Sequence, residues 1–243
     1  MLAAILSFAM LQPAPAYGLA GEAFVFGSWN QYTMDSFNAK LRDPLERFRW
    51  LETDPGVASG FGGGLEVNVR FGRAIQTGLG VGADMLTAAI NKNLGLQPTL
   101  HGTVVEYEQF NLNALVLTLR YSGAIAPADW ISFVWGVAAG VGGLTSRNNY
   151  AVADKMGVPT ETAQIVAPRG NAYEIDAGPN FTLPGPRGVT LGIRVGYRQF
   201  VLGPSVVFRR EFPDKDYSKT YTNTSLDYSG MFFRIVLGSG VCR

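Results

Sequence analysis

Apolar and polar side chains alternate every two residues in many parts of this chain, most clearly between Phe61 and Phe71. Successive side chains of a β-strand point to opposite faces, so this segment has an apolar face and a face of glycine, Glu66, Asn68 and Arg70. A soluble barrel or sandwich buries the apolar face. A membrane barrel turns it outward and keeps polar groups in its lumen. The pattern therefore indicates a β protein of one of these two classes.

The same alternation predicts eight strands and an all-β fold. Their expected ranges are 21–28, 60–71, 75–86, 108–121, 130–142, 171–183, 189–200 and 226–239. In the fourth range, Leu112 is out of phase with Leu115 and Leu117, so we expect a β-bulge near Asn113–Ala114. Aromatic residues near the strand ends predict interface girdles. They are Phe61, Phe71, Phe110, Tyr121, Tyr173, Phe181, Tyr197 and Phe200.

Connections between the expected strands alternate in length. Long ones span 29–59, 87–107, 144–170 and 203–225, and short ones span 72–74, 122–129 and 184–188. An even-stranded outer-membrane barrel has long extracellular loops and short periplasmic turns, whereas a soluble barrel has no reason for this asymmetry. We therefore expect an eight-stranded antiparallel up-and-down transmembrane β-barrel, located in the bacterial outer membrane with both termini in the periplasm.

The first twenty residues have the features of an export signal. Residues 2–11 form an apolar run too short to span a bilayer as a helix, and small residues follow near Ala16 and Ala20. No Lys or Arg precedes this run, which leaves open a start upstream of Met1 or Met1 as an internal methionine. We expect residues 1–20 to be a signal peptide and residues 21–243 to form the barrel. The net charge of +1 gives no general electrostatic case for binding nucleic acid.

The pattern of strands and loops resembles the small eight-stranded outer-membrane barrels of Gram-negative bacteria, the outer membrane protein A/X/W-like group. The resemblance covers about residues 21–239 and rests on the pattern, not on a diagnostic motif. Members of this group commonly end in an aromatic residue that the assembly machinery recognises. This chain instead ends in Gly240-Val241-Cys242-Arg243, with Phe233 ten residues before the end.

Charged residues occupy the expected inward positions of several strands. They are Glu66, Arg70, Asp84, Arg120, Glu174, Asp176, Arg194, Arg198 and Arg234. An eight-stranded barrel has an interior just wide enough for side chains, so we expect an interlocked ion-pair network that fills the lumen. Because the sixth and seventh strands form a hairpin, Glu174 or Asp176 with Arg194 is the first expected pair. The alternative is a narrow polar conduit for small solutes.

Other candidate chemistry is sparse. His101 is the only histidine and Cys242 the only cysteine, so a Cys/His zinc site is excluded, and we expect no metal and no cofactor. Asp43-Pro44-Leu45-Glu46 predicts a helix start within an apolar first loop, which we expect to cover the barrel mouth or recognise a partner. Gly27-Ser28-Trp29 matches the G-x-W of lipocalins, so a secreted lipocalin-like carrier is a competing interpretation.

These patterns predict a non-enzymatic outer-membrane protein with a structural role or a role in interactions through its loops. A lipid-modifying barrel enzyme is a weaker alternative, since it would need His101 with a serine and an acid. Expected partners are outer-membrane lipid and lipopolysaccharide, and an extracellular or envelope protein bound by the long loops. We expect a monomer or a subunit of an envelope complex.

Overall fold

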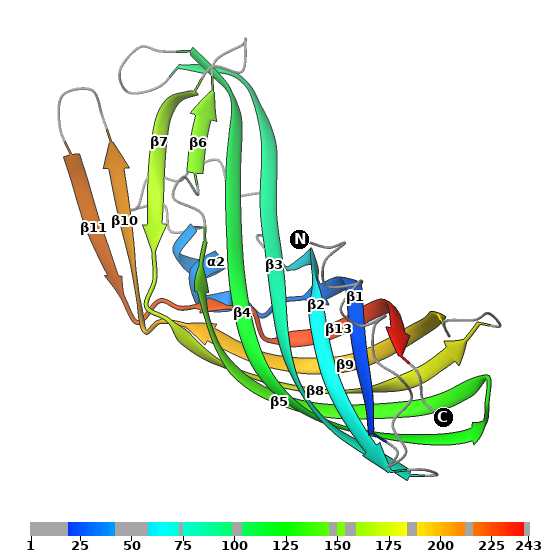
Figure 1. The fold of residues 1–243 in the computed structure, drawn as a ribbon. Helices are drawn as coiled ribbons and strands as arrows, with labels where there is room; N and C mark the ends of the chain where they lie inside the picture. The colour runs from blue at the N-terminus through cyan, green and yellow to red at the C-terminus, as the bar shows by residue number, and fades with distance from the viewer. Residues whose placement is uncertain are drawn as a thin grey trace.

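The computed structural model describes residues 19–41, 58–72, 75–98, 104–145, 150–153, 159–183, 189–211 and 216–240. Eight of its strands close into an antiparallel barrel, because β4 pairs with β5 as well as with β3. In order around the ring, they are β1 (Leu19–Gln31), β2 (Ser59–Gly72), β3 (Ile75–Pro98), β4 (Val104–Ala128), β5 (Ile131–Leu144), β8 (Gly170–Thr182), β9 (Val189–Leu202) and β13 (Gly230–Gly240). The predicted fold class is confirmed (Figure 1).

The short connections and the described ends of the chain lie at one end of the barrel. Leu19 of β1 pairs with Phe71, next to the turn between β2 and β3. Ser239 of β13 likewise pairs with Val189, at the start of β9. We call this end the short-turn end and the opposite one the long-loop end. The connection between β4 and β5 is shorter than expected, since β4 continues to Ala128 and only residues 129–130 form the turn.

Three of the predicted long loops contain strands, so these expectations were wrong in part. β3 and β4 continue far beyond the barrel at the long-loop end (Figure 1). The sheet then extends from β4 through four more strands. These are β6 (Tyr150–Ala153), β7 (Pro159–Val166), β10 (Ser205–Glu211) and β11 (Asp216–Thr222), while the two-residue strand β12 (Leu226–Asp227) pairs with β9. Backbone hydrogen bonds in these loops are thus satisfied by pairing of β6 with the extension of β4 and of the other loop strands with one another.

The predicted bulge at Asn113–Ala114 is absent from the described register. β3 and β4 pair without interruption from Ile75 opposite Ile125 to Asn93 opposite Tyr107. The apolar residues of β4 shift from the outward to the inward face because the lumen is apolar at the long-loop end. Leu112, Ala114 and Val116 point inward there and are fully buried in an apolar cluster. Phe200 belongs to the same cluster, so its assignment to an interface girdle was wrong.

The first loop contains one described helix, α2 (Asp35–Leu41). It begins at the acidic residue Asp35, whose negative charge interacts favourably with the positive end of the helix dipole. The helix start predicted at Asp43-Pro44 lies outside the described residues. Among the described residues, no helix combines the length and apolar character needed to cross a membrane.

The barrel is inverted relative to a soluble protein. Every barrel strand exposes large apolar side chains on its outer face. One example per strand is Trp29, Val67, Val81, Leu119, Val137, Ile175, Val195 and Ile235. The arginines and carboxylates lie on the inner face and are buried. A lipocalin has the opposite arrangement, and Trp29 of the G-x-W segment lies on the exposed face, so the lipocalin interpretation is wrong.

Candidate functional site in the barrel lumen

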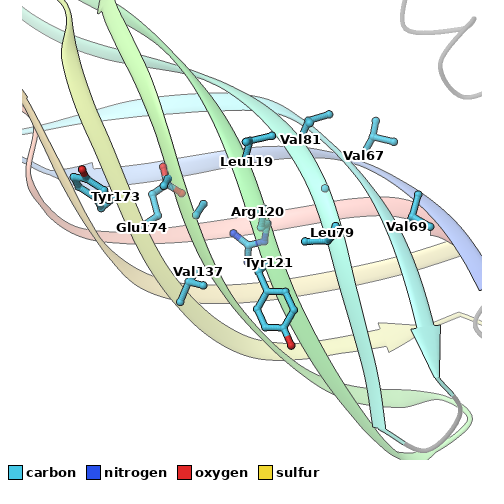
Figure 2. A pocket seen from close by; sticks show the side chains of 13 residues that line it. Val67, Val69, Leu79, Val81, Leu119, Arg120, Tyr121, Val137, Tyr173 and Glu174 are labelled. Atoms are coloured by element: carbon cyan, nitrogen blue, oxygen red, sulfur yellow. The ribbon is translucent and has the colours of Figure 1, made fainter.

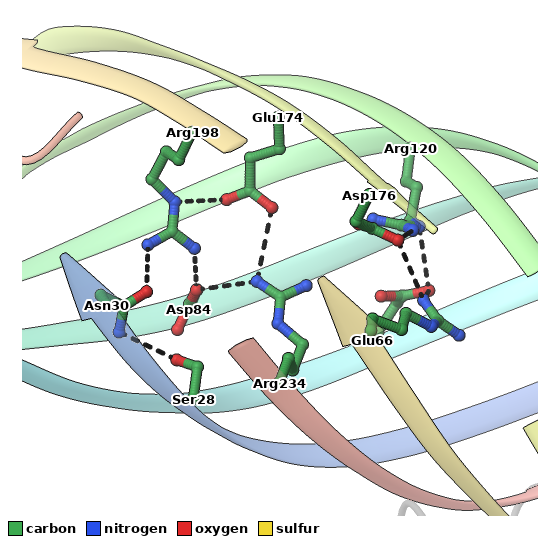
Figure 3. Close-up of polar contacts among 10 residues, drawn as sticks. Ser28, Asn30, Glu66, Asp84, Arg120, Glu174, Asp176, Arg198 and Arg234 are labelled. Atoms are coloured by element: carbon green, nitrogen blue, oxygen red, sulfur yellow. Dashed lines mark hydrogen bonds and ion pairs between the residues drawn. The ribbon is translucent and has the colours of Figure 1, made fainter. Parts of the chain in front are cut away.

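The inner face brings the charged residues into contact, in groups that follow one another along the lumen (Figure 3). Arg198 of β9 donates from Nε to Glu174 at 2.7 Å and also pairs with Asp84 of β3. Arg234 of β13 bridges the same two acids, with Nη2 3.1 Å from Asp84 and 3.4 Å from Glu174. The amide oxygen of Asn30 accepts a further hydrogen bond from Arg198 at 3.2 Å. These residues form a group of two cations and two anions.

A second group of charges lies nearer the short-turn end. Arg120 Nη2 donates to Asp176 at 2.6 Å, and Arg120 Nε lies 3.3 Å from Glu66. The amide of Asn68 donates to the same oxygen of Glu66 at 2.5 Å. Arg194 Nη1 is 3.6 Å from Glu66 and 4.0 Å from Asp176. This group also contains two cations and two anions, but Arg194 is only loosely paired within it.

The remaining buried arginine, Arg70, forms a separate ion pair. Arg70 Nε lies 2.9 Å from Glu22 of β1, and both side chains are buried. Sequence reasoning missed Glu22, although it occupies an inward alternate position of the first strand, two residues before Phe24. With it, the described lumen contains five buried arginines and five buried carboxylates. The lumen is therefore neutral overall, which lowers the cost of burying so many charges.

The pair first expected from the sequence is not the one the structure favours. Glu174 lies directly opposite Arg198 in the register of β8 and β9, whereas Asp176 lies opposite Gly196. Arg194 lies opposite Arg234 of β13. A hairpin assignment alone does not give this register, so the stronger pairs are Glu174 with Arg198 and Asp176 with Arg120.

Inward glycines make room for the long arginine side chains. A Cβ atom on Gly136 of β5 would lie 2.1 Å from Nη2 of Arg120, and one on Gly78 of β3 would lie 2.8 Å from Cγ of Arg70. Both distances are too short for any real contact. The glycines in these strands therefore serve the packing of the lumen, as neighbouring small and large residues do in a filled barrel.

Aromatic rings on β1 and β13 pack against three of the arginines. The Arg234 guanidinium carbon lies 4.0 Å from the ring centre of Phe26 and 4.7 Å from that of Phe232. Arg198 lies 5.3 Å from Phe232, and Arg194 5.6 Å from Phe24. Cation–π contacts of this kind gain strength where water is excluded. These inward rings were not predicted from the sequence, although Phe24 and Phe26 share the parity of Glu22.

An apolar cluster closes the lumen at the long-loop end. Met34, which directly precedes α2, and Phe37, within α2, are buried against Leu86, Leu112 and other strand residues. Outside the strands, Tyr32 and Tyr228 meet edge to face with ring centres 5.2 Å apart. Burial raises the pKa of both phenols well above the usual range. Tyr228 stays neutral and its hydroxyl donates to the carbonyl of Leu112 at 3.0 Å. We call this cluster the apolar plug.

The helix is also attached by polar contacts. The hydroxyl of Ser36 donates to the carbonyl of Ser225 at 3.1 Å and accepts from the Ser225 amide at 3.1 Å. These bonds join the first loop to the segment that follows β11. The first loop therefore contributes Met34 and Phe37 to the cover of the barrel mouth.

The carboxylates of the described lumen are all engaged in ion pairs. All five carboxylates in it are paired with arginine. No group of three or more His, Cys, Asp or Glu residues among the described residues could hold a metal ion. His101 and Cys242 lie outside the described residues. The ion pairs connect strands across the lumen and so stabilise the closed barrel.

Among known proteins, the chain is similar to solved structures of outer membrane proteins. The chain matches no known protein family and no curated protein sequence. It is similar to the outer membrane protein OprG from Pseudomonas aeruginosa, with 10% identity, a TM-score of 0.46, and coverage of 93% of this chain and 97% of that one. It is also similar to the outer membrane protease OmpT from Escherichia coli, with 8% identity, a TM-score of 0.47, and coverage of 96% and 99%. Similarity this low is uninformative about activity.

Proposed function

We propose that this protein is an integral outer-membrane β-barrel with a filled lumen, and that it acts without catalysis, as a structural component or through its long-loop end. One observation carries the proposal: the outer wall exposes apolar side chains on all eight strands while the charges are buried inside. Such a wall is unfavourable in water, since soluble monomers rarely expose contiguous apolar surface and here large apolar side chains are exposed on every barrel strand. A bilayer is the solvent that this wall fits.

The orientation follows from the loops. Outer-membrane barrels keep their short turns in the periplasm, so we place the short-turn end and the described chain ends there. The extended sheet from β3 to β11 then projects outside the cell and is the surface available to a partner. Outer-membrane lipid and lipopolysaccharide surround the wall. The ring closes without a second copy, which is consistent with a monomer.

Membrane fractionation combined with gel migration of heated and unheated samples tests this proposal. A closed barrel stays folded in mild detergent and migrates differently after boiling, so we expect a shift together with recovery in the outer-membrane fraction. Recovery in the soluble fraction would contradict the proposal. Processing of the first twenty residues is read from the N-terminus of the mature protein in the same samples.

A narrow conduit for small solutes is the second candidate, and one observation favours it. Several buried lumen atoms lack a hydrogen-bond partner among the described residues, including all three guanidinium nitrogens of Arg194, Asn180 Oδ1 and Ser122 Oγ. Unpartnered buried polar atoms favour the presence of water. Current measurement in planar bilayers separates the two candidates, because only a conduit gives reproducible open-channel steps.

A further inference from the structure

Arg194 of β9 is fully buried in the lumen, and its guanidinium makes no hydrogen bond to the described residues. Its loose ion pairs run from Nη1, which lies 3.6 Å from Glu66 and 4.0 Å from Asp176. Nε and Nη2 form the other edge of the guanidinium, where neither nitrogen has an acceptor. Arginine keeps its charge and can only donate, so this edge requires an acceptor that the described residues do not supply.

The two acids that Arg194 approaches are held by other donors. Asp176 accepts from Arg120 Nη2 at 2.6 Å. One oxygen of Glu66 accepts from the Asn68 amide at 2.5 Å and lies 3.3 Å from Arg120. A rotation of Arg194 toward either acid would compete with these shorter contacts. The lumen is neutral as a whole, but its carboxylates are engaged elsewhere and leave the Nε–Nη2 edge of Arg194 open.

A second arginine lies directly beside Arg194. Arg234 of β13 is its partner in the antiparallel register, and both residues are buried in the lumen. Like charges directly opposite each other in a sheet are destabilising. Arg234 contacts Asp84 and Glu174 through Nη2, whereas its Nε has no hydrogen-bond partner among the described residues. An anion between the two guanidinium groups would accept from both and reduce their repulsion.

Space and enclosure at this point suit a small ion. On the β8 side, Arg194 lies next to Gly178, where a Cβ atom would be 3.1 Å from the Arg194 Cα, and glycine leaves the most room. The wall encloses the lumen: on β4, Leu119 and Tyr121 are exposed on the outer face, while Arg120 between them is buried (Figure 2). Because Arg194 has no exposed surface, a large or organic anion is excluded.

We propose that the lumen binds one monatomic halide, such as chloride, between Arg194 and Arg234. Water suits other unpartnered atoms of the lumen, such as Ser122 Oγ and Asn180 Oδ1, because water both donates and accepts. At Arg194, three nitrogens can only donate, and a second cation lies beside them, so the site selects an anion. The halide connects the two charge groups of the lumen, since Arg194 belongs to one and Arg234 to the other.

The first test compares stability in two salts. Because the site is enclosed, the full chain is refolded from urea into detergent micelles in sodium bromide or in sodium gluconate, whose organic anion is too large to enter. Equal ionic strength keeps the screening of charges the same. A ligand that binds only the folded state stabilises it, so we expect the urea midpoint to rise with bromide concentration relative to gluconate. Equal midpoints in the two salts would overturn the proposal.

Two variants that each remove one lumen arginine form a matched comparison. Arg194→Met deletes the site, whereas Arg70→Met removes an arginine whose register partners are Ala20 and Gly78. We expect the difference between bromide and gluconate to vanish in Arg194→Met and to persist in Arg70→Met. Heat-modifiable migration shows that each variant has folded. If Arg194→Met does not fold, Arg194→Lys takes its place, since it keeps the charge but loses the edge with two donors.

Two results of this comparison would contradict the proposal. A bromide effect that persists in the folded Arg194 variant would place the ion elsewhere. Loss of the effect in both variants would show that bromide responds to the total charge of the lumen and not to one site.

Anomalous diffraction locates the ion directly. In crystals of protein refolded in bromide, we expect one bromide peak in the lumen, in contact with Arg194 and Arg234. A water molecule at that position, without anomalous signal, would overturn the assignment. A bromide peak there without any rise in the urea midpoint would also overturn it, because this would be binding at crystal concentration only.

Discussion

Asp84 of β3 forms an ion pair with Arg198 of β9 across the lumen, between strands that are not neighbours in the barrel. Around the ring, β3 pairs with β2 and β4, while β9 pairs with β8 and β13. Backbone pairing therefore contributes nothing directly to this contact. It joins opposite walls, and Glu66 of β2 with Arg120 of β4 provides a further link between strands that do not pair. The network braces the barrel from within.

Removal of one partner of Asp84–Arg198 should destabilise the barrel strongly. Either Asp84→Asn or Arg198→Met unbalances the buried charges, although Arg198 keeps Glu174 and Asp84 keeps Arg234 as a second partner. The cost is therefore up to about 3–5 kcal/mol where water is excluded. The double variant should recover much of that loss, which a double-mutant cycle of unfolding free energies in urea measures as coupling. The control cycle is Arg194→Met with Asp176→Asn, whose atoms are 4.0 Å apart. It should show much weaker coupling. Equal coupling in both cycles would contradict the geometry.

The two faces of β2 should respond differently to substitution. Val67 is exposed on the outer wall, so Val67→Arg places a charge against lipid and should cost about 2–4 kcal/mol near the bilayer midplane. Asn68→Ala on the inner face loses its hydrogen bond to Glu66, a cost of about 1–3 kcal/mol. Folding titrations into vesicles measure both. A harmless Val67→Arg would mean that this face does not meet lipid.

Gly136→Ala should disturb the lumen network. Its Cβ would lie 2.1 Å from Nη2 of Arg120, so the guanidinium must move away from Asp176. Overpacking of this kind costs about 1–3 kcal/mol. The matched control is Gly27→Ala, whose Cβ would have no atom within 4 Å. We expect a lower urea midpoint for Gly136→Ala and no loss for Gly27→Ala. Equal midpoints would show that the lumen has spare room there.

Planar-bilayer recordings should show small or no steady currents. The ion pairs and the apolar plug together occupy the lumen, and an eight-stranded barrel has no further width for a pore. Phe37→Asp places a charge in the plug and should loosen it without opening a wide path, because the ion pairs remain. Large, reproducible open-channel steps in the unmodified protein would contradict the filled lumen and favour the conduit.

The sequence alone determined the number of barrel strands, the antiparallel barrel and the two faces of its strands. The reason is local: a period of two assigns each side chain to a side of the wall, and all nine charged residues assigned inward are buried there. The inward position of Glu22 follows from the same alternation.

Only the tertiary structure decided which charges meet. Ring closure places β3 opposite β9 and brings Asp84 to Arg198, and the register of β8 and β9 selects Arg198 over Arg194 for Glu174. Leu112 and Phe200 share the inward parity of Arg120 and Arg198, and the tertiary structure decided only that this part of the lumen is apolar, because Met34 and Phe37 of the first loop fill the mouth. Alternation specifies the side of a wall, whereas partners and local polarity depend on contacts between residues far apart in the chain.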